Sequence, residues 1–464
     1  MTSNGKNGRK LAGMLAYPIM ILSAIALFLL VRSAGSTLVA PAPAITAAAA
    51  GATSGKTDVL LHVLLALLTV IVAARVCGAL CKRIHQPPVI GEVIAGILLG
   101  PSLLGRISSS AMNFVLPPSI APILSIIAQI GVILFMFLIG LRLNTAELKH
   151  RTQATVAISH ASILFPFVLG SALALWLYPK LSTSDVPFTI FALFLGVSLS
   201  VTAFPVLARI LTDRGIDKTH LGIVALTCAA VDDVTAWCLL AFVMAVAKAE
   251  ISGAVVTFLL TGLYLGFMLL VARPLMVRTV RAQELRNSVP QGAVAVVVVG
   301  LLLSALATEA AGIHALFGAF LFGAMIPHDS RLALDLTRKL EDLVVVLFLP
   351  AFFAFTGMRT QIGLVEGASQ WILCGVILAT ATIGKFGGSF VAARMTGFGN
   401  RGAASLGILM NTRGLMELIV LNIGLDLRIL SPTIFTMLVL MAVITTFATT
   451  PILNLLTRNT KEPF

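Results

Sequence analysis

Charged residues are scarce in this chain of 464 residues. Asp, Glu, Lys and Arg together make up 11% of it, while 58% of the residues are hydrophobic. A soluble globular domain has about a quarter of its residues charged, so this composition excludes an ordinary soluble fold. The sequence also lacks long hydrophilic stretches, which leaves no segment for a separate soluble domain.

Cysteine is scarce as well, and its five positions predict neither a disulfide framework nor a metal site. Cys77, Cys81 and His85 share one helical spacing, but a Pro-Pro pair ends that helix and no fourth ligand follows. The segment AGATSGKT (residues 50–57) fits a loose phosphate-loop pattern, but it follows an Ala-rich linker instead of a strand. We therefore predict no resident metal and no cofactor.

Apolar runs dominate the chain, and many of them reach about 18 residues, the length that crosses a bilayer core. We predict an all-α polytopic membrane protein in which an N-terminal apolar segment precedes thirteen core transmembrane helices. The core spans are centred near residues 69, 96, 130, 166, 199, 234, 263, 300, 319, 350, 382, 414 and 444.

The predicted membrane domain covers residues 58–456. Residues 1–57 precede it and hold the N-terminal apolar segment and an Ala-rich external linker. That apolar segment, about residues 11–31, is either an extra span or a signal peptide. Its run of about 20 residues is long for a signal peptide, whose apolar core has roughly 7–15. Residues 457–464 form a short cytoplasmic tail.

The net charge of +13 reflects orientation in the membrane rather than a surface for nucleic acid. With a cytoplasmic N-terminus, 22 of the 32 Lys and Arg residues fall in segments on the inner side and seven on the outer side. Basic residues favour the cytoplasmic side of a membrane. We therefore predict a multi-pass protein of the cell (inner) membrane with a cytoplasmic C-terminus, a lipid bilayer as partner and no nucleic acid.

A few ionisable residues lie inside the predicted spans. An ionised side chain at mid-bilayer costs about 2.5–3.5 kcal/mol on insertion scales, so each one is a functional hypothesis. The alternative is a salt bridge between helices that only fixes their packing. The candidates at similar depth are Asp232, Asp233, Lys385, Arg413 and Glu417, with Glu92 in a short span.

Two predicted spans carry polar interruptions at their middle. In LFLGVSLSVTAFPVLARIL, Pro205 cannot donate a helical hydrogen bond, and Ser198, Ser200 and Thr202 precede it. The other interruption is Asn-Thr-Arg-Gly at residues 411–414. The two sites lie about 209 residues apart in spans of opposite direction.

Two short, Gly-rich spans, centred near residues 96 and 319, are related in the same way, by a similar separation and opposite directions. Gly96 and Gly318 are 222 residues apart, again in opposite orientations. This is the pattern of inverted repeats with two broken helices that cross near the membrane midplane. Such breaks free backbone carbonyls for a small cation, and nearby charges offset the exposed helix dipoles.

These motifs resemble a known family. SVTAFPVLARIL, VDDVTAW, IGKFGGSF and NTRGLMELIVLNIG together resemble the monovalent cation:proton antiporter superfamily. QPPVIGEVIAGILLGP and GIHALFGAFLFG are similar to its branch of plant cation/H+ exchangers and bacterial Na+(K+)/H+ antiporters. The resemblance covers about residues 59–456. It implies thirteen core spans, a dimerisation bundle beside a six-helix core, a homodimer, and elevator-like alternating access.

The resemblance also implies roles for individual residues. Asp233 matches the shared cation and proton carrier, and Asp232 the preceding position, which is an amide in many plant and glutathione-gated relatives. Lys385 matches the lysine that pairs with Asp232 in electrogenic members. Thr202 joins the two aspartates as a cation- and proton-binding residue. Four residues have structural roles at the helix breaks: Pro205, Asn411, Arg413 and Glu417.

The predicted function is therefore secondary antiport of a monovalent cation, Na+ or K+, for protons, and not enzymatic catalysis. A carboxylate in a low-dielectric cavity gains proton affinity and holds either a proton or a cation. Two alternatives are a passive cation channel and a K+/H+ efflux system gated by a separate subunit. Charge balance is also open: exchange is electrogenic if Lys385 carries a proton and electroneutral if Lys385 only shields Asp232.

Overall fold

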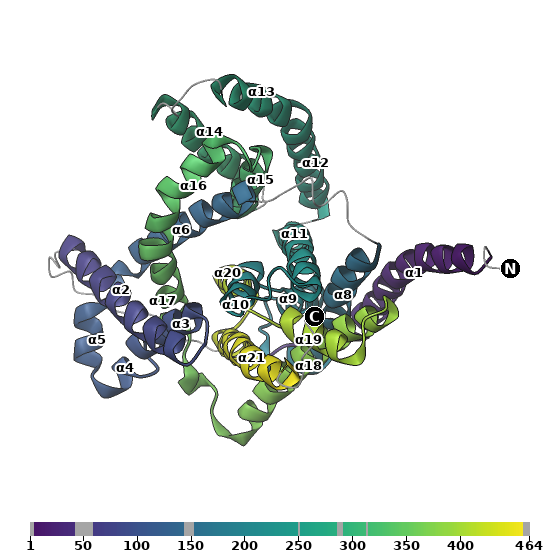
Figure 1. Ribbon diagram of the computed structural model, residues 1–464. Coiled ribbons are helices and arrows are strands. Elements are labelled where there is room, and N and C mark those ends of the chain that lie inside the picture. Colours follow the sequence, from purple (N-terminus) through teal and green to yellow (C-terminus); the bar gives the residue numbers. More distant parts are fainter. Residues whose placement is uncertain are drawn as a thin grey trace.

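The computed structural model is helical throughout the residues that it describes (Figure 1). Within them, ten helical stretches are long and apolar enough to cross a membrane. The prediction of an all-α, multi-pass membrane protein is therefore confirmed. The linker and most of the tail predicted at the two ends of the membrane domain lie outside the described residues, which are 4–41, 59–142, 153–248, 251–284, 291–311 and 314–457.

One group of helices forms an open arc in Figure 1, and we call it the outer arc. Within it α3 packs on α2 and α17, and α15 packs on α6 and α14. Its elements are α2 (Val59–Arg83), α3 (Pro88–Leu99), α4 (Leu104–Ile107), α5 (Ser109–Val115), η1 (Pro118–Ile120), α6 (Ala121–Arg142), α12 (Ile251–Phe267), η2 (Met268–Ala272), α13 (Arg273–Glu284), α14 (Gln291–Ala310), α15 (Ala315–Met325), α16 (Arg331–Leu343), η3 (Val344–Phe348), α17 (Leu349–Arg359) and η4 (Ile362–Leu364).

The remaining helices form a central bundle beside this arc (Figure 1). In it α18 packs on α8, α19 and α21, and α11 packs on α8, α9 and α19. A further helix, α1 (Asn4–Gly35), lies against α8 and α9. The bundle contains α8 (Gln153–Leu181), α9 (Phe188–Ser200), α10 (Phe204–Asp213), α11 (His220–Lys248), α18 (Gly367–Met395), α19 (Asn400–Met410), α20 (Leu415–Asp426) and α21 (Pro432–Thr457).

The predicted span centres agree with this architecture. Twelve of the thirteen centres fall within described helices. The centre near residue 414 falls at the break between α19 and α20. Because only ten stretches meet the length of a membrane crossing, the count of thirteen stays a prediction. Whether α1 is an extra span or a signal segment also stays open.

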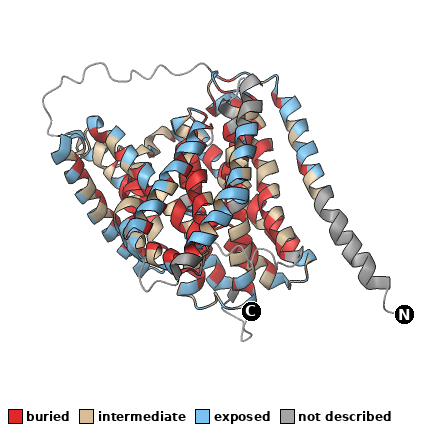
Figure 2. Ribbon diagram, turned by 90° about the horizontal axis from the view of Figure 1, so that it is seen from above, coloured by how far each residue is buried: buried red, intermediate tan, exposed pale blue. Residues whose placement is uncertain are grey.

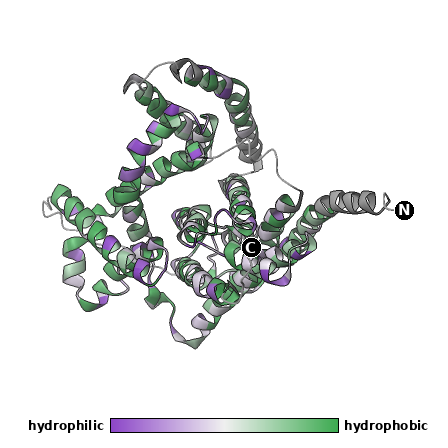
Figure 3. Ribbon diagram, viewed as in Figure 1, coloured by the Kyte–Doolittle hydropathy of each residue, from purple (hydrophilic) through white to green (hydrophobic). Residues whose placement is uncertain are grey.

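The surface of the outer arc is apolar where it faces outward. On α2, Leu60, Leu64, Leu68, Val72 and Val76 are all exposed, and their spacing of four residues places them on one helix face. Figures 2 and 3 show exposed, hydrophobic helix faces around the molecule. Lipid is the environment that such a surface requires, because a soluble protein rarely exposes large contiguous apolar patches.

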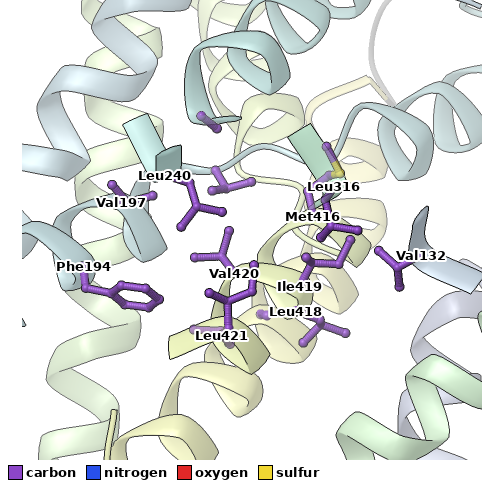
Figure 4. Close-up of a cluster of buried hydrophobic side chains, with 14 of the residues drawn as sticks. Val132, Phe194, Val197, Leu240, Leu316, Met416, Leu418, Ile419, Val420 and Leu421 are labelled. Carbon is purple, nitrogen blue, oxygen red and sulfur yellow. The ribbon is translucent and has the colours of Figure 1, made fainter. Parts of the chain in front are cut away.

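The half helix α20 is mostly apolar, and most of its apolar side chains are buried. Met416, Leu418, Ile419, Val420 and Leu421 are each at most 3% exposed. Figure 4 shows these side chains among residues of α6, α9, α11 and α15. This packing fixes the position of the polar residues that precede α20 in the chain.

Candidate functional site

Two interrupted helices meet inside the central bundle. Residues 201–203 separate α9 from α10, and residues 411–414 separate α19 from α20. The backbone N–H of Ala203 donates to the carbonyl of Thr412 at 3.0 Å, so the two breaks touch. Pro205 stands in the first turn of α10, where its missing N–H costs no helical hydrogen bond. Both breaks fall where the sequence predicts them.

Asp232 is fully buried on α11, and its carboxylate is surrounded by donors. The hydroxyl of Ser159 donates to Oδ1 at 2.6 Å. The hydroxyls of Ser162 and Thr202 donate to Oδ2 at 2.6 and 2.8 Å, and Lys385 Nζ lies 3.0 Å from the same oxygen. Three hydroxyls and one ammonium group thus satisfy both oxygens of this carboxylate.

Lys385 is fully buried on α18 and has an acceptor for each of its three N–H groups. Besides Asp232, it donates to the carbonyl of Ser200 at 2.5 Å and to the hydroxyl of Ser162 at 3.5 Å. Because Ser200 ends α9, Lys385 places positive charge at the negative end of that half helix. The two residues that the family resemblance pairs thus form a buried salt bridge.

Asp233 differs sharply from its neighbour. Its side chain is 3% exposed, yet neither carboxylate oxygen has a side-chain hydrogen-bond partner among the described residues. The backbone N–H of Phe204, at the positive end of α10, is a hydrogen-bond donor to it, whereas Asp232 and Lys385 act on it through their charges. Successive helical residues point about 100° apart, which explains why the two aspartates have different surroundings.

Arg413 is the largest fully buried side chain in the described part of the protein. Its guanidinium donates to the carbonyls of Ser198 and Leu199 at 3.1 and 2.7 Å, so it caps the C-terminal end of α9. It also lies 3.4 Å from Glu417, which stands in the first turn of α20. The sequence did not predict that Arg413 reaches across to the other broken helix.

The backbone of Arg413 is held by α21. Thr446 Oγ1 accepts from the N–H of Arg413 at 2.9 Å and lies 2.8 Å from its carbonyl oxygen. The Thr446 hydroxyl therefore provides hydrogen bonds for the backbone N–H and carbonyl of Arg413, which lies between two helices.

Charges of opposite sign face three of the four exposed half-helix ends. Lys385 and Arg413 lie at the C-terminal end of α9, Asp233 at the N-terminal end of α10, and Glu417 in the first turn of α20. Each pairing is favourable with the helix dipole. The arrangement keeps two broken helices stable inside the bundle.

Most of the residues predicted from sequence converge here. Thr202 donates to Asp232, and it also lies 3.1 Å from the carbonyl of Met410. Asn411 is buried, and its Oδ1 has no partner among the described residues. Glu92 lies on α3 in the outer arc, and no described hydrogen bond connects it to this cluster.

Sequence reasoning missed Ser159, Ser162 and Thr446. The two serines follow one another at i, i+3 in a largely apolar helix, which places them on one face. That spacing was the available signal. Across the described part of the chain, no group of three or more His, Cys, Asp or Glu residues forms a metal centre.

The fold and this cluster define a class, the membrane transporters in which two broken helices cross beside buried charged residues. A family model described as "Sodium/hydrogen exchanger, transmembrane" matches residues 71–456, and the chain belongs to this family. The family consists of antiporters, which are transporters and not enzymes.

Individual relatives agree with the family. The chain is 45% identical over 381 residues to the Na+/H+ antiporter NhaS4 of Synechocystis sp. The aligned residues cover 82% of this chain and 93% of that protein. It is 41% identical over 390 residues to cation/H+ antiporter 20 of Arabidopsis thaliana, but it spans only 46% of that protein's length. The structure of the sodium proton antiporter MjNhaP1 from Methanocaldococcus jannaschii has the same fold. The two structures superpose with a TM-score of 0.64 at 13% sequence identity. The superposition covers 87% of this chain and 99% of the MjNhaP1 chain.

Proposed function

We propose that the protein exchanges Na+ or K+ for protons and that Asp233 is the carboxylate that holds either one. The observation that carries this proposal is a buried aspartate whose carboxylate oxygens have no side-chain hydrogen-bond partner among the described residues. A buried carboxylate has to be neutralised or paired. A proton and a dehydrated cation each neutralise it, but they compete for the same oxygens. Competition at one site that opens to each side in turn is sufficient for exchange.

Oxygen atoms near the two breaks support cation binding. Ser198 Oγ, Asn411 Oδ1, Thr412 Oγ1 and Glu417 Oε1 are buried and have no hydrogen-bond partner among the described residues. Oxygens of this kind replace part of the hydration shell of a monovalent ion. The backbone carbonyls released by the breaks add to them.

The other predicted site residues have supporting roles in this proposal. Asp232 and Lys385 are the charge-balancing pair, and Thr202 contributes its hydroxyl to the cation and proton site. Pro205, Asn411, Arg413 and Glu417 maintain the breaks. The contacts of Arg413 with the end of α9 support that role, because they satisfy the carbonyls of Ser198 and Leu199 at a buried helix end where Lys385 reaches only Ser200.

The division into two groups of helices supports alternating access as the mechanism. We propose that the central bundle, which holds the site, moves against the outer arc. A polar contact between the groups is the ion pair of Arg359 on α17 with Asp426 on α20, at 2.6 Å. The proposed assembly is a homodimer in which each chain has thirteen core spans with inverted repeats. It lies in the cell (inner) membrane, with the C-terminus of each chain in the cytoplasm.

We propose Na+ as the first candidate for the transported cation. The name of the Synechocystis relative specifies Na+, and that of the Arabidopsis relative specifies only a cation. K+ is the second candidate, because oxygen ligands of this type suit both ions.

Proteoliposomes test this function. With a preset pH difference, addition of Na+ or K+ should dissipate the difference in the unmutated protein and not in Asp233→Asn. A suitable control is Asp335→Asn, because Asp335 lies on the surface of α16 and its side chain is 37% exposed. Exchange by Asp233→Asn at the unmutated rate would contradict the central assignment. A response that disappears when the membrane potential is clamped would indicate a passive cation channel.

A further inference from the structure

Ser159 and Ser162 of α8 hold the carboxylate of Asp232 from one side. Both side chains are fully buried, and they donate to different oxygens of Asp232 at 2.6 Å.

Each of these hydroxyls also has a second acceptor within reach. Ser162 Oγ lies 2.8 Å from the carbonyl of Ser159, and Ser159 Oγ lies 3.4 Å from the carbonyl of Cys228. A hydroxyl has one hydrogen and two lone pairs, so it donates to only one of its two acceptors at a time. When the hydrogen turns to the carbonyl, the oxygen presents lone pairs toward Asp232.

This choice suits a group that meets an anion and a cation in turn. Toward a bare carboxylate, the favourable orientation of a hydroxyl is with its hydrogen forward. Toward a cation on that carboxylate, the favourable orientation is with its lone pairs forward. The carbonyls of Ser159 and Cys228 accept the released hydrogens, so neither hydroxyl loses a hydrogen bond when it turns.

We propose that Ser159 and Ser162 are ligands of the transported cation, which they bind together with Asp232 by turning their hydrogens to these two carbonyls. The inference rests on the proposed exchange function. Lys385 keeps its hydrogen bond to the carbonyl of Ser200 when the cation displaces it from Asp232. The cation site thus extends from Asp233 to the face of α8, and the serines contribute to the choice among Li+, Na+ and K+.

A third serine on the same helix provides the matched control. Ser171 is fully buried on α8, but it donates to the carbonyl of Ala192 at 3.2 Å and contacts no carboxylate by hydrogen bond. Ser171→Ala therefore removes the same atom from an equally buried position outside the site.

The experiment measures exchange in proteoliposomes over a series of Li+, Na+ and K+ concentrations. Ser159→Ala and Ser162→Ala should each raise the half-saturating cation concentration about two- to tenfold, as expected for one lost hydroxyl ligand. The maximal rate should stay within about twofold of the unmutated rate, and the ratio of half-saturating concentrations among the three ions should change. Ser171→Ala should change none of these quantities.

The outcomes separate the inference from the function on which it rests. If the unmutated protein exchanges and Asp233→Asn does not, while both serine variants keep the half-saturating concentrations, the serines are not ligands and the proposed function stands. A loss of maximal rate alone, with lower thermal stability in detergent, would assign the serines to packing and also overturn the inference. Absence of exchange in the unmutated protein would refute the function itself.

Discussion

The neighbouring residues Asp232 and Asp233 should respond in opposite directions to the same isosteric substitution. Asp232→Asn removes the charge that pairs with buried Lys385 and that accepts from three hydroxyls. Removing one partner of a buried ion pair costs about 3–5 kcal/mol, because the other charge stays buried and unpaired. We therefore expect the midpoint of thermal unfolding to fall clearly in this variant.

Asp233→Asn removes a buried charge that no side-chain hydrogen bond stabilises in the described part of the chain. A buried ion without compensation costs several kcal/mol, whereas a neutral unsatisfied amide costs about 1–3 kcal/mol. The substitution should therefore raise the unfolding midpoint while it abolishes exchange. A gain in stability together with a loss of transport is the signature of a functional charge.

Thermal unfolding of the purified protein in detergent, in alkaline choline buffer without Na+ or K+, measures both effects. At acidic pH the advantage of Asp233→Asn should shrink, because a protonated Asp233 carries no charge in the unmutated protein. The deficit of Asp232→Asn should persist under the same conditions, since the salt bridge with Lys385 is absent at either pH. Equal destabilisation by both substitutions, or a larger one by Asp233→Asn, would refute this account of the two aspartates.

Two further predictions concern Thr446 and Lys385. Thr446→Val should destabilise the protein by about 1–2 kcal/mol and slow exchange, because it removes the hydroxyl that binds the backbone of Arg413. Thr445→Val is the control in a thermal-unfolding and flux comparison, since the Thr445 hydroxyl bonds only carbonyls of its own helix. For Lys385, the carbonyl of Ser200 remains an acceptor even when a cation displaces it from Asp232, which favours a lasting positive charge, so exchange should be electroneutral. Its rate in proteoliposomes should not respond to a valinomycin-clamped potential, and a clear response would identify Lys385 as a proton carrier.

The helix breaks and the central charges could be predicted from the sequence because each violates a local rule. Pro205 cannot continue the hydrogen-bond pattern of a helix, and Asp232, Asp233 and Lys385 are expensive in an apolar span. Such residues can be recognised from the sequence alone. Their placement in the structure agrees with the salt bridge of Asp232 with Lys385 that the sequence suggests.

The hydroxyls could not be identified in this way. A serine or threonine in an apolar helix ordinarily bonds a carbonyl of its own preceding turn, as Thr445 does with Met441 at 2.8 Å. Ser162 and Thr446 look the same in the sequence, and only the neighbouring helices reveal their second partners. The reach of Arg413 to Ser198 is hidden for the same reason, since 215 residues separate the two in the chain.

The buried charges at the crossing also bear on leakage. Three carboxylates (Asp232, Asp233, Glu417) and two cations (Lys385, Arg413) are each at most 3% exposed, so in their ordinary ionised forms they leave one uncompensated negative charge. A proton or a monovalent cation on Asp233 cancels it. A central bundle that crossed without cargo would carry this charge through an apolar environment, at a cost of about 2.5–3.5 kcal/mol. That penalty slows the unloaded return by about two powers of ten, so slippage of either ion alone is suppressed without any dedicated gate.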